Sequence, residues 1–298
     1  MRYRPFNSHF APNQGVVVEM PKSNVQAAWG EFLAAGLPPE KWFCSAQELP
    51  ITRFPTSDQR PAFVFSFMRS GTHFLMNTLA NVFGYVADPW MELENVPINF
   101  YYRPSVEKLL QIFGRQRFSN IGKSHQSAEF FRDAAINVDP RIHFFYIYRH
   151  PVDCLASYRH FLPTWPVNVT AHDSLVDLMK AKPSSYHARH CWSMADTLLD
   201  YWTRHVQDWL ALATRLNIHV IRYEDLVSDF DGEVAKIGSF IGQRVVEARR
   251  PNADAYIKAG PLAQHIADDD DGRVKAMDYV HRRCPALLET LGYGDLSL

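Results

Sequence analysis

The chain has 298 residues, of which 47% are hydrophobic and 21% are charged, as in an ordinary soluble globular protein. Its formal net charge of −1 argues against a nucleic-acid partner, although it leaves room for a local basic pocket. The four cysteines are widely spaced and form no CxxC pair, so neither a zinc ribbon nor a disulfide framework is indicated. The apolar runs are far shorter than a membrane span, and the N-terminal segment lacks the apolar core of a signal peptide. We therefore expect a cytoplasmic protein without a membrane span.

Taken in chain order, residues 1–60 are irregular with scattered prolines, and we expect an N-terminal extension that packs on the core. Residues 61–298 form the main domain. Runs of aromatic and β-branched residues predict buried strands at residues 62–67, 118–125, 141–150 and 217–225. Apolar residues at helical spacing predict helices at residues 73–83, 151–161, 193–216 and 232–242. Strands that alternate with helices predict a single α/β domain, in which a mainly parallel central sheet is flanked by helices.

The first predicted strand ends in Arg69-Ser70-Gly71-Thr72, and a helix follows directly. Ligands of parallel sheets bind beyond the carboxyl ends of the strands, and a helix that begins there points backbone N–H groups at a phosphate or sulfate. Gly71 allows the backbone to approach such an anion closely, and Arg69 adds a fixed positive charge. The hydroxyl groups of Ser70 and Thr72 are further donors. The Walker signature cannot be written onto this loop, because it has no early Gly and no Gly-Lys. The alternative is an ordinary strand–helix turn with an N-capping Ser or Thr.

Two further strand ends carry side chains suited to an anion. Arg149 ends the strand at 141–150, and Ser157 lies about two turns into the next helix, so a guanidinium and a hydroxyl could share a terminal phosphate. A surface Arg and a solvent-facing Ser are the alternative. Lys123 and His125 flank Ser124 where another strand ends, and residues two apart in an extended segment point the same way. A cation and a potential base would then face one site.

Together the three strand ends resemble the sulfotransferases that use 3′-phosphoadenosine 5′-phosphosulfate (PAPS), over residues 61–242. In that family a P-loop-like segment, with Lys or Arg before Ser-Gly-Thr, holds the 5′-phosphosulfate, and here it is Arg69-Ser70-Gly71-Thr72. A Lys-Ser/Thr-His segment carries the catalytic base, here Lys123-Ser124-His125. An Arg followed eight residues later by a Ser binds the 3′-phosphate, here Arg149 and Ser157.

The resemblance marks further nucleotide-binding positions. An aromatic residue soon after the loop lies near the adenine, here Phe74 after His73, where Thr-Trp is commoner. The strand that ends in Tyr-Glu-Asp-Leu supplies Tyr223 near the same ring. The family's late basic-Gly loop is degenerate here, with Lys258 and Gly260 as candidates for the 3′-phosphate. Arg69 stands where many members have Lys, and unlike Lys it cannot be deprotonated.

The resemblance implies transfer of a sulfuryl group from PAPS to a hydroxyl or amine, with adenosine 3′,5′-bisphosphate (PAP) as the product nucleotide. His125 would take the acceptor proton, since a histidine with its reference pKa of about 6.5 is a usable base near neutral pH. Lys123 and Arg69 would offset charge on the sulfuryl and bridging oxygens. No metal is implied, because protein cations can neutralise the transferring group.

An aromatic-rich segment between the loop and His125 favours a small organic acceptor over a long polysaccharide. Its aromatic residues are Phe83, Tyr85, Trp90, Phe100, Tyr101 and Tyr102, with Glu92 and Glu94 nearby. Carbohydrate, lipid and peptidyl-tyrosine acceptors stay open, and the sequence indicates no oligomeric state. Two other functions also stay open: a P-loop kinase of small molecules and a non-catalytic nucleotide-binding protein of the same fold. The missing Walker Lys counts against the first, and the presence of both Lys123 and His125 against the second.

Overall fold

The computed structural model describes residues 2–3, 20–21, 58–86, 90–93, 96, 98–115, 120–132, 141–162, 172–191, 193–245, 247–251 and 270–294. Near the N-terminus, β1 (Arg2–Tyr3) pairs antiparallel with β2 (Met20–Pro21). The rest of the expected extension up to residue 57, and the way it packs, lie outside the described residues. The boundary at residue 60 therefore stays a prediction.

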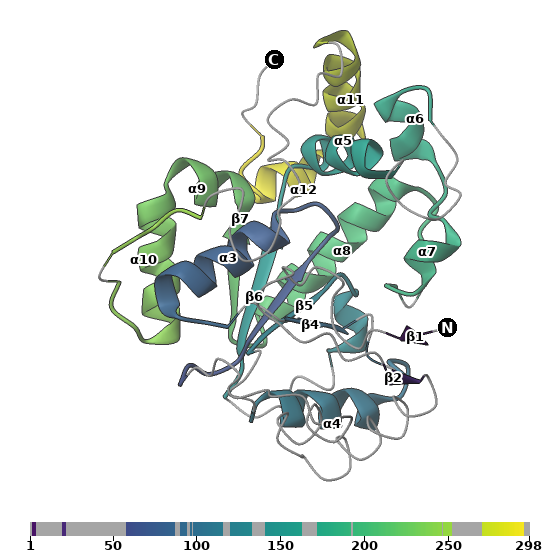
Figure 1. Cartoon of the computed structure of the whole chain (residues 1–298). Coiled ribbons are helices and arrows are strands. Elements are labelled where there is room, and N and C mark those ends of the chain that lie inside the picture. Colours follow the sequence, from purple (N-terminus) through teal and green to yellow (C-terminus); the bar gives the residue numbers. More distant parts are fainter. Residues whose placement is uncertain are drawn as a thin grey trace.

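A sheet of five parallel strands forms the centre of the molecule, in the order β4-β5-β3-β6-β7 (Figure 1). The strands are β3 (Ala62–Ser66), β4 (Met91–Glu92), β5 (Ile121–Ser124), β6 (His143–Tyr148) and β7 (Ile218–Arg222). The predicted α/β fold with a parallel sheet is thus confirmed, and each of the four predicted strands contains one observed strand. The edge strand β4 was not predicted, because two residues are too few to give a strand pattern.

Helices connect and cover these strands. They are α3 (Thr72–Phe83), α4 (Arg103–Phe113), the 3₁₀ turn η2 (Ala128–Phe130), α5 (Pro151–Phe161), α6 (Leu175–Lys180), α7 (Ser185–Ala188), α8 (Leu198–Ala213), α9 (Tyr223–Ser228), α10 (Phe230–Ile241), α11 (Asp270–Arg283) and α12 (Pro285–Thr290). The helix expected at 193–216 begins later, at Leu198, because the hydroxyl of Thr197 accepts the backbone N–H of Asp200 at 3.0 Å and caps it there. Among the described helices, none has the length and apolar character that a membrane span requires.

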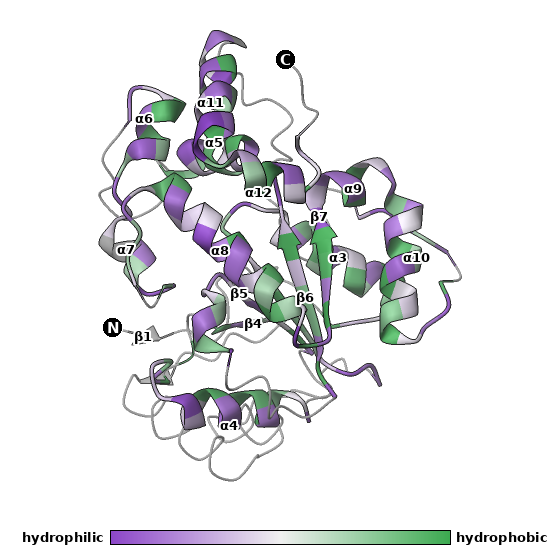
Figure 2. Ribbon diagram, turned by 180° about the vertical axis from the view of Figure 1, so that it is seen from behind, coloured by the Kyte–Doolittle hydropathy of each residue, from purple (hydrophilic) through white to green (hydrophobic). Residues whose placement is uncertain are grey.

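The two faces of the sheet bury alternate residues of each strand. On β3, Ala62 and Val64 belong to a core cluster with α3, α9 and α10. Phe63 and Phe65 face the opposite way, toward α4 and α8, and the ring of Phe65 stacks on that of Trp209 at 4.1 Å. Figure 2 shows hydrophobic residues along the strands, whereas α4 carries hydrophobic and hydrophilic residues side by side. Helices on both faces therefore hold the sheet in one register, and with it the positions of the strand ends.

A third core cluster lies beyond the carboxyl ends of the strands. Phe67 and Met68, directly after β3, pack with side chains of α5, α6, α8, α11 and α12. In Figure 1 α5, α6, α11 and α12 form a group at this end of the sheet. This helical group gives the loops at the strand ends a solid support on one side.

Buried histidines make the stability of this fold depend on pH. Burial lowers the pKa of His143, His187 and His205 from 6.5 to about 4 each. Between these values the unfolded chain binds more protons than the folded one, so the free energy of unfolding falls as the pH drops from about 6.5 toward 4. Urea unfolding at a series of pH values measures this loss.

In the variant His143→Ala, the slope of unfolding free energy against pH should be shallower by up to about 1.4 kcal/mol per pH unit, one proton's worth. A wild-type stability that stays constant between about pH 6.5 and 4 would contradict the inference that these histidines are neutral in the folded protein.

Candidate functional site

The loop between β3 and α3 has the backbone shape of an anion-binding nest. Arg69 and Gly71 both lie in the left-handed region, with φ of 65° and 95°. For Arg69 this conformation stores strain, on the order of 1–3 kcal/mol, that the surrounding structure must offset. Among the described residues no side chain caps the N-terminus of α3, and a helix N-terminus of this kind suits an external acceptor. Such a turn leading into an open helix end favours binding of a phosphate or sulfate.

Both hydroxyl groups of the loop have protein partners. Ser70 is fully buried, and its Oγ lies 3.2 Å from Sγ of Cys154 on α5. The Oγ1 of Thr72 lies 2.6 Å from Oγ of Ser66, the last residue of β3. These contacts anchor the loop to the strand and to α5, so the structure directs the Ser70 hydroxyl toward the interior.

Arg69 reaches across to α5. Its Nε donates to Oγ of Ser157 at 3.0 Å, and its guanidinium carbon lies 4.7 Å from the ring centroid of Phe161. Burial, and secondly the charge of Arg149, lower the pKa of Arg69. Two guanidinium groups are thus held close enough to repel each other, an arrangement that a bound anion would relieve.

Arg149 lies on the other side of the loop, against Tyr223. Its guanidinium carbon lies 4.6 Å from the ring centroid of Tyr223, the first residue of α9. Its Nε is buried and has no hydrogen-bond partner among the described residues. The sequence pairs Arg149 with Ser157, but the hydrogen bond of Ser157 in the structure is with Arg69. Arg149 therefore has a buried N–H donor that no described protein group accepts.

Aromatic rings continue from Tyr223. The rings of Phe74 and Tyr223 lie 6.2 Å apart edge to face, and Phe74 contacts Phe230 at the same centroid distance. The guanidinium of Arg250 lies 5.7 Å from the centroid of Phe74. Sequence reasoning missed Arg250, because it lies in an irregular segment without a motif. Flat rings and a third cation here suit a nucleobase.

Lys123 and Glu92 form an ion pair beside the loop. They are paired in the register of β4 and β5, and Nζ lies 2.9 Å from Oε1. Lys123 is 6% exposed, so the pair is largely shielded from water. His73, at the start of α3, packs its ring 5.6 Å from that of Trp90, two residues before Glu92. Glu92 is therefore a partner of Lys123 rather than a solvated carboxylate.

His125 directly follows β5, and its hydrogen bonds fix its tautomer. Its Nδ1 lies 3.0 Å from the carbonyl oxygen of Ser66, which can only accept, so Nδ1 carries the hydrogen. Burial first, then Lys123 and His190, lower the pKa of His125 well below its usual value. The ring is therefore neutral near pH 7, with its lone pair on Nε2. The backbone carbonyl of His125 accepts from Nε2 of His205 at 3.2 Å, which holds the segment on α8.

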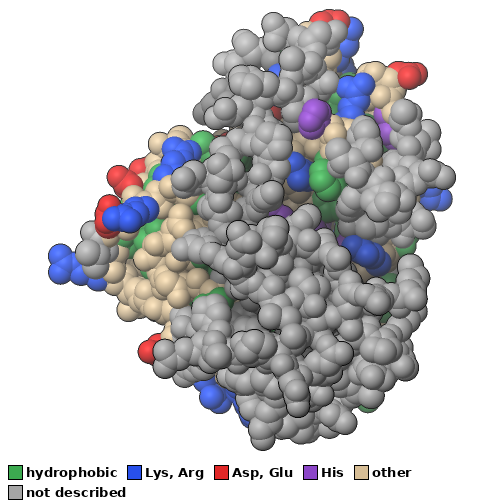
Figure 3. Space-filling view, viewed as in Figure 1, with side chains coloured by type: hydrophobic (Ala, Val, Ile, Leu, Met, Phe, Trp, Pro, Cys, Tyr) green, Lys and Arg blue, Asp and Glu red, His purple; other side chains and the backbone are tan. Residues whose placement is uncertain are grey.

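These residues come from the carboxyl ends of the five neighbouring strands of the sheet. Figure 3 shows basic and histidine side chains at the surface over the part of the molecule where the strands of Figure 1 end. A family model described as "Sulfotransferase domain" matches residues 59–258. The chain belongs to the sulfotransferase domain family.

Two relatives show how similar the sequence is to those of other members of this family. A 3-beta-hydroxysteroid sulfotransferase of Cavia porcellus is 24% identical over 183 residues, which are 60% of this chain and 58% of that protein. Sulfotransferase 4A1 of Homo sapiens is 25% identical over 229 residues, 73% of this chain and 70% of that protein. The chain thus matches less than two thirds of the length of the Cavia porcellus enzyme. A crystal structure of mouse sulfotransferase SULT7A1 complexed with PAP covers 79% of this chain and 70% of its own, with 16% identity and a TM-score of 0.43.

The described aromatic residues of the segment between the loop and His125 lie in different surroundings, and not around one site as the sequence suggested. Phe83 and Tyr85 are core residues, and the O–H of Tyr85 lies 3.0 Å from Nδ1 of His143, at the amino end of β6. Tyr101 packs edge to face on Phe130, with centroids 5.2 Å apart. Trp90 is the aromatic residue of this segment that contacts the loop side, through His73.

Two expected nucleotide-binding residues, Lys258 and Gly260, lie outside the described residues, as does Glu94. In the described part of the chain, no group of three His, Cys, Asp or Glu side chains is placed to hold a metal ion.

Gly71 has a steric role that can be tested. A Cβ at this residue would lie 2.2 Å from Cδ2 of Tyr223, and its φ of 95° already disfavours any other residue. Gly71→Ala should lower the free energy of unfolding by about 3 kcal/mol, from backbone strain and overpacking together. Urea unfolding monitored by circular dichroism measures it.

The matched control is Gly84→Ala, at the C-terminus of α3. Its φ is 70°, but nothing lies within 4 Å of an added Cβ, so only the backbone strain applies. We expect a loss of about 1–2 kcal/mol for this variant. Equal losses for the two variants would show that the contact of Gly71 with Tyr223 is not tight.

Proposed function

We propose that this chain is a sulfotransferase that moves a sulfuryl group from PAPS to a hydroxyl or amine of a small organic acceptor. The proposal rests on three features that lie at the carboxyl ends of the strands. Two guanidinium groups, of Arg69 and Arg149, lie near the start of α3, which no described side chain caps, and a neutral histidine with its lone pair on Nε2 follows the neighbouring strand β5. An anionic donor and a proton-accepting base are what sulfuryl transfer needs.

The described residues fit PAPS. When bound, PAPS supplies the sulfuryl group and presents phosphate oxygens at both ends of its ribose. The loop 69–72 and the first turn of α3 suit the phosphosulfate, while the buried Nε of Arg149 suits the 3′-phosphate. Phe74 and Tyr223 form an aromatic wall for the adenine. Ser157 acts on the nucleotide through Arg69, whose guanidinium it orients.

His125 is the general base in this proposal. Its Nδ1–H is held by the carbonyl of Ser66, so Nε2 is the atom that takes the acceptor proton. The protonated ring can keep its Nδ1–H bond, which lowers the cost of the charge it gains. Lys123 and Arg69 offset negative charge at the transferring group, and Glu92 holds the Lys123 ammonium in place.

A small organic acceptor is favoured over a polymer. The relatives in Cavia porcellus are named for hydroxysteroids, which are small alcohols. The surroundings of His125 include the ring of His190, at a centroid distance of 6.2 Å, and His73, whose ring packs on that of Trp90. Because Glu92 is neutralised by Lys123, it gives no preference for a cationic acceptor.

The nucleotide is the first test. PAP without metal should bind and, at a hundredfold excess over its dissociation constant, add about 2.7 kcal/mol to the free energy of unfolding. AMP, which lacks the 3′-phosphate, should stabilise much less, because Arg149 would have no partner. Thermal shift with PAP, AMP and Mg-ATP measures the three. Stabilisation by Mg-ATP alone would instead support a kinase, and equal effects of AMP and PAP would remove the 3′-phosphate site.

The base is the second test. His125→Ala should bind PAP normally yet transfer the sulfuryl group about 10²–10⁴-fold more slowly, the usual contribution of a positioned base. A more acidic acceptor, such as a nitrophenol, should partly restore the rate, since it loses its proton more easily. In the wild type the rate should hold until the pH falls below about 6.5, because the pKa of His125 is lowered and the neutral base persists.

His143→Ala is the control for this experiment. His143 is also a buried histidine, 8% exposed, but it lies at the amino end of β6, away from the strand ends of the site. The control should lose stability and keep its turnover. A His125→Ala enzyme that behaves in the same way would assign His125 a structural role and leave the proton to another group.

A further inference from the structure

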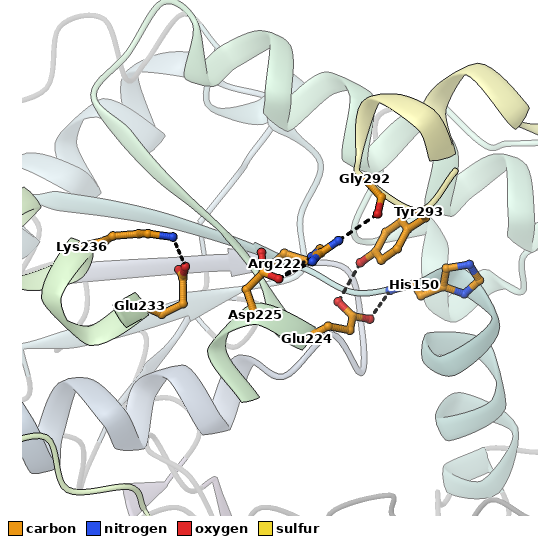
Figure 4. A network of polar contacts seen from close by, with 8 residues as sticks. All are labelled: His150, Arg222, Glu224, Asp225, Glu233, Lys236, Gly292 and Tyr293. Atoms are coloured by element: carbon orange, nitrogen blue, oxygen red, sulfur yellow. Dashed lines mark hydrogen bonds and ion pairs between the residues drawn. The ribbon is translucent and has the colours of Figure 1, made fainter. Parts of the chain in front are cut away.

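Tyr293 lies near the C-terminus, after α12 and outside the region that the sulfotransferase family model matches. It is 2% exposed, and it contacts two segments that are about 70 residues apart in sequence: the end of β6 and the start of α9. Figure 4 shows its ring between these segments, with its hydroxyl pointing at Glu224. Its contacts reach both sides of the proposed nucleotide site.

Glu224 joins Tyr293 to the end of β6. One carboxylate oxygen, Oε2, accepts the O–H of Tyr293 at 2.8 Å, and the other, Oε1, accepts the backbone N–H of His150 at 2.9 Å (Figure 4). Hydrogen bonds to a charged acceptor are the stronger ones, so this bridge fixes the backbone directly after Arg149.

Ring contacts add to this bridge. The ring of Tyr293 meets that of His150 edge to face at 4.8 Å and that of Tyr148 at 6.2 Å. The guanidinium of Arg222 lies 5.5 Å from the centroid of Tyr293, and its Nη1 donates to the carbonyl of Gly292 at 3.0 Å. Asp225 holds the other side of the same guanidinium (Figure 4). We call Gly292 and Tyr293 the C-terminal clasp.

The residues that the clasp contacts are the sequence neighbours of Arg149 and Tyr223. Arg149 stands between Tyr148 and His150, and Tyr223 stands between Arg222 and Glu224. All four flanking residues touch the clasp, whereas Arg149 and Tyr223 touch each other, with the guanidinium 4.6 Å from the ring centroid. Arg149 directly follows β6 and Tyr223 begins α9, so it is these contacts, and not the alternation of a strand, that define the two sides. The clasp therefore contacts the residues that flank Arg149 and Tyr223 in each segment, while Arg149 and Tyr223 contact each other.

We propose that Tyr293 is a positioning residue for the nucleotide, which sets Arg149 against Tyr223 for the 3′-phosphate. This inference rests on the proposed function, because it needs a 3′-phosphate at Arg149. The clasp does not touch the ligand itself. It acts by limiting the freedom of the guanidinium before binding, so that less conformational entropy is lost when the phosphate arrives.

The test is Tyr293→Phe, which removes the hydroxyl and keeps the ring. The affinity for PAP, measured by calorimetry, should fall about tenfold, the scale of one hydrogen bond to a charged group. The affinity for AMP should match that of the wild type, because AMP has no phosphate at Arg149. In the Arg149→Ala background the same change should cost no further PAP affinity.

Tyr85→Phe is the matched control. Tyr85 is 4% exposed, and its hydroxyl is hydrogen-bonded to His143 at 3.0 Å, at the amino end of β6. It should lose stability and keep the wild-type ratio of PAP to AMP affinity. If Tyr293→Phe does not fold, Glu224→Gln tests the same proposal, since it replaces the charged acceptor of the bridge with a neutral side chain of the same size.

The outcomes separate the two proposals. A wild type that binds PAP and AMP equally would overturn the proposed 3′-phosphate site, and the clasp's role with it. A wild type that prefers PAP, combined with a variant of unchanged preference, would overturn the role of Tyr293 alone. If Tyr293→Phe lowered the affinities for PAP and AMP equally, the role of Tyr293 would be structural only. The same would follow if its loss of PAP affinity added to that of Arg149→Ala.

Discussion

The ring of Tyr223 occupies the space that a side chain at residue 71 would fill, and the rest of the site depends on this contact. A Cβ there would come within 2.2 Å of the ring, so glycine is required for steric reasons as well as for its φ of 95°. The guanidinium of Arg149 lies over the same ring at 4.6 Å. One aromatic ring thus contacts the segments that follow β3, β6 and β7. These strands are parallel neighbours, so their carboxyl ends lie at the same end of the sheet.

Charge at this edge is left for a ligand because nearby carboxylates are engaged elsewhere. Asp153, in the first turn of α5, pairs with Arg273 of α11 at 2.7 Å. Glu224 accepts from Tyr293 and from the backbone of His150. Neither carboxylate forms an ion pair with Arg149 in the described part of the chain. Lys123 differs, since an ion pair with Glu92 holds its ammonium in place.

The sequence predicted the parts of this arrangement that depend on local pattern, and it could not predict the contacts between them. The strands β3 and β6 follow from continuous apolar runs, and the loop 69–72 from its position between a strand and a helix. The partner of Ser157 did not follow, because helical spacing places its hydroxyl on a face and does not say which side chain crosses to it. Tyr293 gave no signal at all, since its contacts join residues far apart in sequence.

Ser66 connects the anion-binding loop to the base. Its hydroxyl bonds to Thr72 at the start of α3, and its carbonyl accepts the Nδ1–H of His125. As the last residue of β3 it is paired with Ile147 of β6, which fixes the position of its carbonyl group. A shift of the loop toward an anion would act on the residue that fixes the tautomer of His125.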